Sequence, residues 1–439
     1  MQRRDFPSHI MEINGLNPWN LLLLATVSGA VVQFIGKRRK INVPRTAIVL
    51  MALFYFAILI AYVRAAMDLG SIPAHIRPGL IGFTGEFIIN RIKFILPAVL
   101  LYLACDSRRD LKVAIGVILF SAVAYACLVI KRVPMSSLLV SDASDFMRYR
   151  HRIDRDIGLM AIDMSMLLAG SFWALFVVIV LAIRKSSVRL VGLLPLVVVF
   201  VGMALCHSRG GYVGFLATGI MLAAARWPKM LLLLPIAIGG LFVAIPAVPA
   251  RLGMGVGVAD VSGSTTQDWD QITAGRLTDL WPVALDEFGK SPLVGYGGYA
   301  CTRTQIRDRW LELGNAPSHP HNAYLEVLLD MGIIGFLPVM ALYGAILSVT
   351  FRLFRVRDDR LAAAVGGMGL AMITTLLVTA MGCQTFYPAQ STVLYWCIWA
   401  LGLRLFVDRA HARMLPAPGM AYRSRMNVRY RKRDLLPRG

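Results

Sequence analysis

Residues 318–326 read Ser-His-Pro-His-Asn-Ala-Tyr-Leu-Glu, and they close the one long polar stretch of a strongly apolar chain. That stretch occupies residues 248–320, with long hydrophobic blocks before and after it. A helix that crosses a membrane needs about 20 largely apolar residues, and both blocks supply this pattern repeatedly. The polar stretch therefore predicts a large loop outside the membrane, which we call the cap, and residues 318–326 mark the return of the chain into the membrane.

The composition of the 439-residue chain is typical of an integral membrane protein. Hydrophobic residues make up 57% and charged residues 16%, and the mean hydropathy is +0.63, whereas soluble domains have roughly 45–50% apolar and about 25% charged residues. The net charge of +21 is explained by Lys and Arg in short loops, which favour the cytoplasmic side, so we expect no nucleic-acid partner. The six cysteines form no metal-type pairs, and we expect neither a disulfide framework nor zinc.

The apolar segments predict an all-α, polytopic membrane helix bundle. Eleven segments are visible, and a twelfth span would leave both chain ends in the cytoplasm, which gives 11–12 transmembrane helices. The predicted domains are an N-terminal transmembrane bundle at 1–247, the cap at 248–320, C-terminal transmembrane helices at 321–407 and a basic cytoplasmic tail at 408–439. The segments lie at about 19–35, 44–62, 87–103, 111–130, 157–183, 188–206, 212–225, 230–246, 320–351, 361–381 and 391–406.

Charge patterning orients the cap. The basic run at 37–40 and the Arg-rich turns after several later spans mark the cytoplasmic side, so the cap faces away from it. Within the cap, residues 273–288 and 302–313 carry apolar side chains at helical spacing. We expect two short amphipathic helices there, with their apolar stripes packed over the mouth of the bundle.

A second outer loop, at 131–156, is unusually basic for its side of the membrane. It carries six Lys or Arg against four Asp, which runs against the usual orientation rule. Two interpretations remain open at this point: a solvated helix of mixed charge, or a cationic surface for a phosphorylated partner. In the second case Arg148 and Arg152 are candidate binding residues.

Two arginines on the outer side are candidates for binding an anion. Arg209 lies in a tight turn between two spans, where an arginine usually lines a cavity or pairs with an anion, although it can also extend to the lipid headgroups. Arg276 is predicted in the first turn of a cap helix, where free N–H groups and a guanidinium together suit a phosphate. The alternative for Arg276 is a surface ion pair with Asp279.

His321 is the candidate general base. It follows Pro320, a residue favoured at the first helical position, so we predict it in the first turn of the next span, where the helix dipole opposes protonation. A neutral imidazole is what a general base requires. His319 is a rival two residues earlier, and a capping or interfacial role for His321 is the alternative.

Guanidinium and imidazole groups around one outward cavity suit the transfer of a group from a diphosphate. The arginines would hold the leaving group and the histidine would deprotonate an acceptor hydroxyl. We expect no metal and no cofactor, because guanidinium groups can neutralise the developing charge. The Asp-x-Asp sequences at 154–156 and 268–270 have bulky or cationic middle residues, and we interpret them as solvated carboxylates.

The motifs at 208–212 (Ser-Arg-Gly-Gly-Tyr), 275–276 (Gly-Arg) and 320–326 (Pro-His-Asn-Ala-Tyr-Leu-Glu) occur in this order around the cap. Together they resemble the O-antigen ligase and polymerase family, membrane glycosyltransferases related in fold to the GT-C class. The resemblance covers mainly residues 205–350.

The resemblance implies transfer of a glycan from undecaprenyl pyrophosphate at the periplasmic face of the bacterial inner membrane, without a metal. Arg209 and Arg276 would bind the pyrophosphate and His321 would activate the acceptor, with Asn322 and Tyr324 beside them and His319 as a further substrate-binding candidate. The chain length resembles that of a ligase that joins O-antigen to lipid A–core, and the basic loop at 131–156 would suit a phosphorylated core.

Other functions remain open from the sequence. A polymerase or a protein O-oligosaccharyltransferase of the same family would share the donor. A transporter of lipid-linked sugars would need the arginines but no proton acceptor, and a scaffold would need neither.

Overall fold

A computed structural model describes residues 18–37, 43–74, 77–139, 143–233, 245–253, 276–314 and 317–414, with residues 235, 239 and 242. All regular elements in this part of the chain are helical, which confirms the predicted all-α membrane bundle. The helices are α1 (Pro18–Lys37), α2 (Arg45–Met67), α3 (Leu80–Thr84), α4 (Asn90–Ala104), α5 (Arg108–Arg132), α6 (Ala143–Ile157), α7 (Ala161–Leu181), α8 (Ser186–Ala204), α9 (Arg209–Arg226), α11 (Ala247–Gly253), α13 (Trp281–Lys290), α14 (Ala300–Arg303), α15 (Ile306–Glu312), α16 (Ala323–Phe354), α17 (Arg360–Thr379) and α18 (Val393–Met414).

Eight of these helical segments are long and apolar enough to cross a membrane. They correspond to eight of the eleven predicted spans, from α2 to α18. The predicted span at 19–35 is the helix α1, and the one at 212–225 is the glycine-containing helix α9, neither of which is among the eight. The predicted span at 230–246 lies largely outside the described residues.

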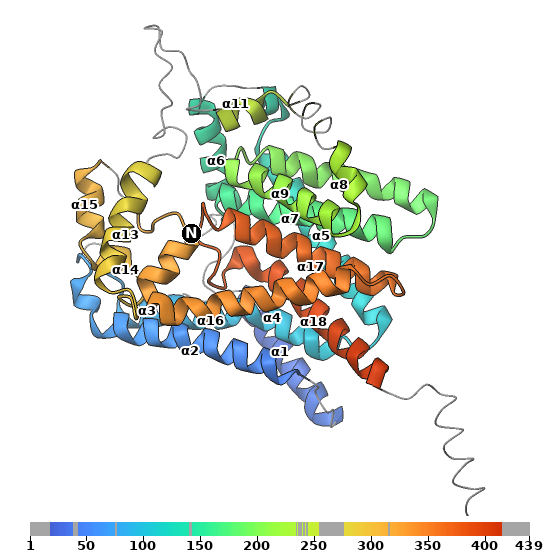
Figure 1. Cartoon of the computed structure of the whole chain (residues 1–439), viewed down its shortest axis with the longest axis horizontal. Helices are drawn as coiled ribbons and strands as arrows, with labels where there is room; N and C mark the ends of the chain where they lie inside the picture. Colours follow the sequence, from blue (N-terminus) through green and yellow to red (C-terminus); the bar gives the residue numbers. More distant parts are fainter. Residues whose placement is uncertain are drawn as a thin grey trace, which may run out of the picture.

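The helix α17 is the centre of the bundle, with α7, α9, α16 and α18 packed around it (Figure 1). Small residues allow these close approaches, as is usual where lipid removes the hydrophobic drive between helices. A β-carbon at Gly367 of α17 would lie 2.5 Å from Val177 of α7. A β-carbon at Gly211 of α9 would lie 1.6 Å from the Ser165 hydroxyl oxygen of α7. One continuous core joins helices from both sides of the cap sequence.

A break in α16 anchors the cap. Gly332 has φ 63° and ψ −171° inside the helix, a conformation that glycine adopts without steric cost. The break frees backbone groups of α16 that pair with the cap chain: the N–H groups of Tyr296 and Gly297 donate to the carbonyls of Leu329 and Asp330, both at 2.8 Å. The Asp330 carboxylate also accepts from the N–H of Ala300, at 3.1 Å. The cap is therefore attached to the bundle through backbone bonds as well as through apolar contacts.

The two predicted cap helices are present, and each is divided into two parts. Residues 276–280 form a π-helical turn, η5, which leads into α13, and Pro282 lies at the start of α13, so it introduces no kink into a continuous helix. The second predicted helix divides into α14 and α15. Their apolar side chains form a separate cluster around the buried Trp310, whose indole N–H donates to the Leu280 carbonyl at 3.2 Å. The three helices lie together at one end of the bundle (Figure 1).

Candidate functional site

The two ends of the bundle carry different sets of residues. At the end we call the cap end, α9 and α16 begin and α8 and α17 finish, beside α11 and η5. At the other, the basic end, Arg108 and Arg409 pair with Asp359, and Arg226 donates to the carbonyls of Phe354 and Val356. All residues of the candidate site lie at the cap end.

Arg209 is the first residue of α9, where the leading N–H groups of a helix have no partner within it. Its Nε donates to the Arg251 carbonyl at 2.8 Å, and the Nε of Arg251 donates to the His207 carbonyl at 3.2 Å. These two bonds orient both guanidiniums around the turn between α8 and α9. Gly211 allows α9 to approach α7 closely, because a side chain there would overlap Ser165.

Arg276 begins η5, as the sequence predicted for a helix start. A β-carbon at Gly382 would lie 3.3 Å from its Nη1 and 3.5 Å from Cδ1 of Ile162, and a β-carbon at Gly210 would lie 3.4 Å from the same Cδ1. The Arg276 guanidinium and the start of α9 therefore both lie close to Ile162. Chain segments far apart in sequence meet here.

Arg150 of α6 completes the cluster. It shares a helix face with Phe146 and Ile153, both fully buried. Burial, followed by repulsion from Arg150 and Arg209, lowers the pKa of Arg276. Burial, followed by repulsion from Arg150, Arg209 and Arg276, lowers the pKa of Arg251 to about 10. The four guanidiniums are thus close enough to disfavour one another's charge.

Two arginines of the cluster, Arg150 and Arg276, have no carboxylate partner among the described residues. Among the described residues, no carboxylate lies within ion-pair distance of Arg150 or Arg276. Asp154 lies near Arg150, but its Oδ1 accepts from the Ala161 N–H at 2.6 Å. Half-buried guanidiniums in this state are suited to an anion from outside the chain.

The predicted position of His321 in the first turn of a helix is wrong. The helix α16 begins at Ala323, because the Asn322 side chain caps it by accepting from the N–H groups of Tyr324 and Leu325. His321 has φ 50°, a left-handed conformation that lies outside the dihedral range of a right-handed helix. Burial, with repulsion from Arg276 and Arg150, lowers the pKa of His321 to about 4. Burial is the main cause of this shift and the two arginines add to it, whereas no helix dipole acts on His321 from within a first turn.

His319 lies against His321, with ring centroids 4.2 Å apart. Its Nδ1 accepts from the His321 backbone N–H at 3.1 Å. Burial, with repulsion from His321 and Arg276, lowers its pKa to about 3. Both histidines thus belong to the arginine cluster.

The other predicted site residues have structural contacts. The Tyr324 hydroxyl donates to the Leu377 carbonyl at 2.8 Å, and Asn322 is the helix cap described above. Arg148 is exposed and pairs with Asp145 at 2.7 Å, while Nη1 of Arg152 donates to the Arg132 carbonyl at 3.3 Å. Their predicted roles in substrate binding stay predictions.

Sequence reasoning missed Arg150 and Arg251 as members of the site. The spacing of Phe146, Arg150 and Ile153, at i, i+4 and i+7, places Arg150 on the apolar stripe of α6. Arg148 and Arg152 fall on the opposite face, so a helical projection of the basic loop would have selected Arg150. Arg251 lies between Ala250 and Leu252 at the start of the cap, an apolar setting that marks an arginine as unusual.

The fold and the site define a multi-pass helical membrane protein with guanidinium and imidazole groups gathered at one end. Residues 194–340 match the family model described as O-antigen ligase. This match confirms the resemblance to the O-antigen ligase and polymerase family, and it spans the end of α8, α9, α11, the cap and the first half of α16. A search of curated proteins finds no match. Among the described residues, no group of three or more His, Cys, Asp or Glu side chains is arranged to hold a metal ion.

Proposed function

We propose that this protein is an O-antigen ligase, which transfers an O-antigen glycan from undecaprenyl pyrophosphate to lipid A–core at the periplasmic face of the inner membrane. The observation that supports it best is the convergence of Arg150, Arg209, Arg251 and Arg276 with His321 at the cap end. A pyrophosphate is the donor group that needs several cations, and an imidazole next to it suits an acceptor hydroxyl.

The distribution of charge supports the periplasmic orientation. Arg108, Arg226, Arg355 and Arg409 gather at the basic end, and excess Lys and Arg in short loops favours the cytoplasmic side. The arginines of the candidate site lie at the opposite end, where the large cap also lies. A lipid-linked donor whose glycan has already been moved to the periplasmic face would meet the arginines at the cap end.

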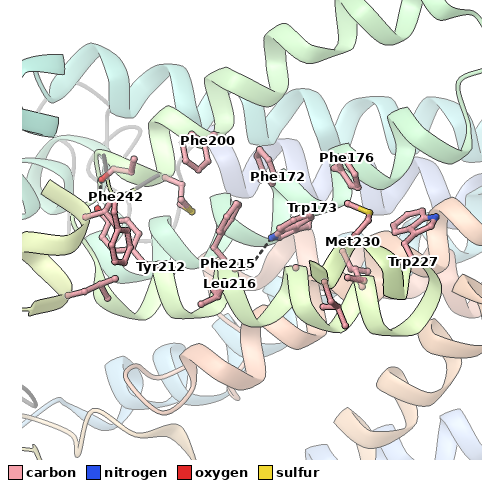
Figure 2. A pocket seen from close by; sticks show the side chains of 18 residues that line it. Phe172, Trp173, Phe176, Phe200, Tyr212, Phe215, Leu216, Trp227, Met230 and Phe242 are labelled. Atoms are coloured by element: carbon pink, nitrogen blue, oxygen red, sulfur yellow. Dashed lines mark hydrogen bonds between the residues drawn. The ribbon is translucent and has the colours of Figure 1, made fainter. Parts of the chain in front are cut away.

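An apolar cavity of about 400 Å³ next to the arginines supports a lipid-linked donor. It is lined by aromatic side chains of α7, α8 and α9, including Phe172, Trp173 and Phe215 (Figure 2). Tyr212, one turn after Arg209, and Leu252, next to Arg251, also line it. The cavity thus reaches residues that neighbour Arg209 and Arg251 in the chain, and part of a polyprenyl chain would fit its apolar surface.

In the proposed reaction, the neutral His321 imidazole accepts the proton of the acceptor hydroxyl. The acceptor oxygen forms a bond to the anomeric carbon while the bond from that carbon to the pyrophosphate oxygen breaks. The leaving undecaprenyl pyrophosphate keeps the electron pair, and the guanidiniums stabilise its charge without a metal. The imidazolium then returns its proton to water.

The test uses purified protein in detergent with a lipid-linked O-antigen donor and lipid A–core. We expect glycosylated lipid A–core from the wild type, and a loss of about 100-fold or more in His321→Ala, because general base catalysis typically contributes that much. Transport has no meaning in detergent, so product formation would exclude a transporter.

Donor consumption without transfer to lipid A–core would contradict the ligase. Growth of the glycan on a second lipid-linked donor would indicate the polymerase of the same family, and transfer to a protein would indicate an O-oligosaccharyltransferase. A folded His321→Ala variant with wild-type activity would remove the proton acceptor from the mechanism.

A further inference from the structure

The backbone around His321 is fixed from several sides. The Pro320 carbonyl accepts from the indole N–H of Trp281 on α13, at 3.0 Å. The Ala323 N–H donates to the Ala380 carbonyl at the end of α17, at 2.8 Å. Between these two anchors, the His321 N–H donates to Nδ1 of His319 at 3.1 Å. The chain from residue 319 to residue 323 is therefore a rigid turn that connects the cap to the bundle.

This turn holds His321 in an unfavourable conformation. A φ of 50° is uncommon for a residue with a β-carbon and persists only where surrounding contacts impose it. The bond from the His321 N–H to His319 is the contact nearest to the strained dihedral. Loss of this hydrogen bond would remove one contact that stabilises the left-handed backbone of His321. A change in that backbone would turn the imidazole away from the arginine cluster.

The same bond assigns a tautomer to His319. In a neutral imidazole one nitrogen is a donor and the other an acceptor. Because Nδ1 accepts from a backbone N–H, the proton of the neutral His319 ring is on Nε2. The lone pair of Nδ1 is therefore already in use, and Nε2 has none to offer. His319 cannot accept a substrate proton in this state, which leaves His321 as the acceptor.

We propose that His319 is a positioning residue for His321, which holds the left-handed turn through Nδ1 and keeps the His321 imidazole aimed at the arginine cluster. This inference rests on the proposed function for its effect on activity, but the hydrogen bond itself can be tested without it. The proposal also separates the two histidines of the motif into one that reacts and one that orients.

Two substitutions distinguish positioning from direct contact with substrate. In His319→Asn the amide oxygen takes the place of Nδ1 and can still accept the His321 N–H, whereas in His319→Gln the amide reaches the place of Nε2. We expect His319→Asn to keep glycan transfer within about threefold of wild type. We expect His319→Gln to lower kcat by about 10- to 100-fold with little change in the KM for the donor, because misplacement of a reacting group by about 1 Å costs that much.

A greater loss in the Asn variant than in the Gln variant would show that Nε2 contacts substrate, and it would overturn the proposal. Two variants of wild-type activity, or equal losses in both, would overturn it as well. Retained activity in His319→Asn would therefore show that the hydrogen-bond acceptor at the place of Nδ1 is what matters. If only the bulk of the ring mattered, the smaller Asn side chain would not retain activity.

Amide hydrogen exchange tests the bond in the wild-type protein, where folding of a variant is not in question. Pro320 has no amide, so a short peptide that begins at His319 reports mainly on His321 and the residues after it. We expect the His321 amide to be protected in the wild type and in His319→Asn, and to exchange faster in His319→Gln. An unprotected His321 amide in the wild type would contradict the proposal.

The proton-acceptor role of His321 and the positioning role of His319 can be contradicted independently. If His321→Ala keeps full transfer activity while the His321 amide is protected, the proposed proton acceptor is wrong and the His319 bond stands. If His321→Ala is inactive and the amide is unprotected, the reaction stands and the positioning role is wrong.

Discussion

The arginines around Asp359 at the basic end and the arginines of the candidate site at the cap end are used in opposite ways. At the basic end, Arg108 and Arg409 both pair with Asp359, which is itself buried and caps α17. At the cap end, Arg150 and Arg276 have no carboxylate at ion-pair distance among the described residues, and the site arginines repel one another. Arginines paired with a carboxylate have their charge balanced within the chain, whereas half-buried arginines that repel each other are suited to an anionic ligand.

The largest expected effect that tests this contrast is at Arg276. Removal of its guanidinium in Arg276→Ala should lower glycan transfer by about 100-fold, as loss of one donor to a developing anion usually does. Arg276→Lys, which keeps the charge but not the planar fork, should retain part of the activity. The measurement is capped lipopolysaccharide in a ligase-null strain, normalised to the amount of folded protein. A wild-type amount of capped lipopolysaccharide from Arg276→Ala would contradict the proposed anion-binding role of the arginines at the cap end.

The next effect is on stability and concerns the close contact between α9 and α7. Gly211→Ala should destabilise the protein by about 1–3 kcal/mol, because the added methyl group would overlap Ser165 of α7 and displace α9. Gly210→Ala is the matched control, since its methyl group would meet Ile162 at an ordinary 3.4 Å. Thermal unfolding in detergent compares the two. Equal melting temperatures would show that α9 moves without cost.

At the basic end, Asp359→Ala should lower stability and leave transfer per folded molecule unchanged. The carboxylate caps α17 through the N–H groups of Leu361 and Ala362, and loss of such a cap costs about 1 kcal/mol. The pair with Arg108 adds little, because that side chain is 67% exposed. A large fall in activity at unchanged stability would mean that the basic end also takes part in glycan transfer.

The buried state of the two histidines also predicts a dependence of stability on pH. The folded-state pKa values of His319 and His321, about 3 and 4, lie below the ordinary value of about 6.5. Between pH 6.5 and 4 the unfolded chain therefore binds more protons than the folded one, and stability should fall as pH falls through that window. Each histidine contributes up to about 1.4 kcal/mol per pH unit. A melting temperature that stays constant over this range would contradict the buried, neutral state of both rings.

Local pattern was sufficient for the class of fold. Runs of about 20 apolar residues predict membrane helices because unsatisfied backbone groups are too costly in lipid, and eight of the eleven predicted spans are present as long helices. The amphipathic spacing at 273–288 predicted a cap helix, and η5 with α13 is found there. The motifs around Arg209, Arg276 and His321 resemble the O-antigen ligase and polymerase family, and residues 194–340 match the family model described as O-antigen ligase.

The sequence by itself determined the bundle, the cap and three of the residues that meet at the cap end, because hydropathy and short motifs are local properties. Only the tertiary structure decided that Arg150 and Arg251 join them, since the approach of α6 and α11 to α9 depends on contacts between distant segments. It also decided that His321 stands before its helix with a positive φ. No periodicity encodes that conformation, because bonds from His319, Trp281 and Ala380 to the turn around His321 fix its backbone from outside.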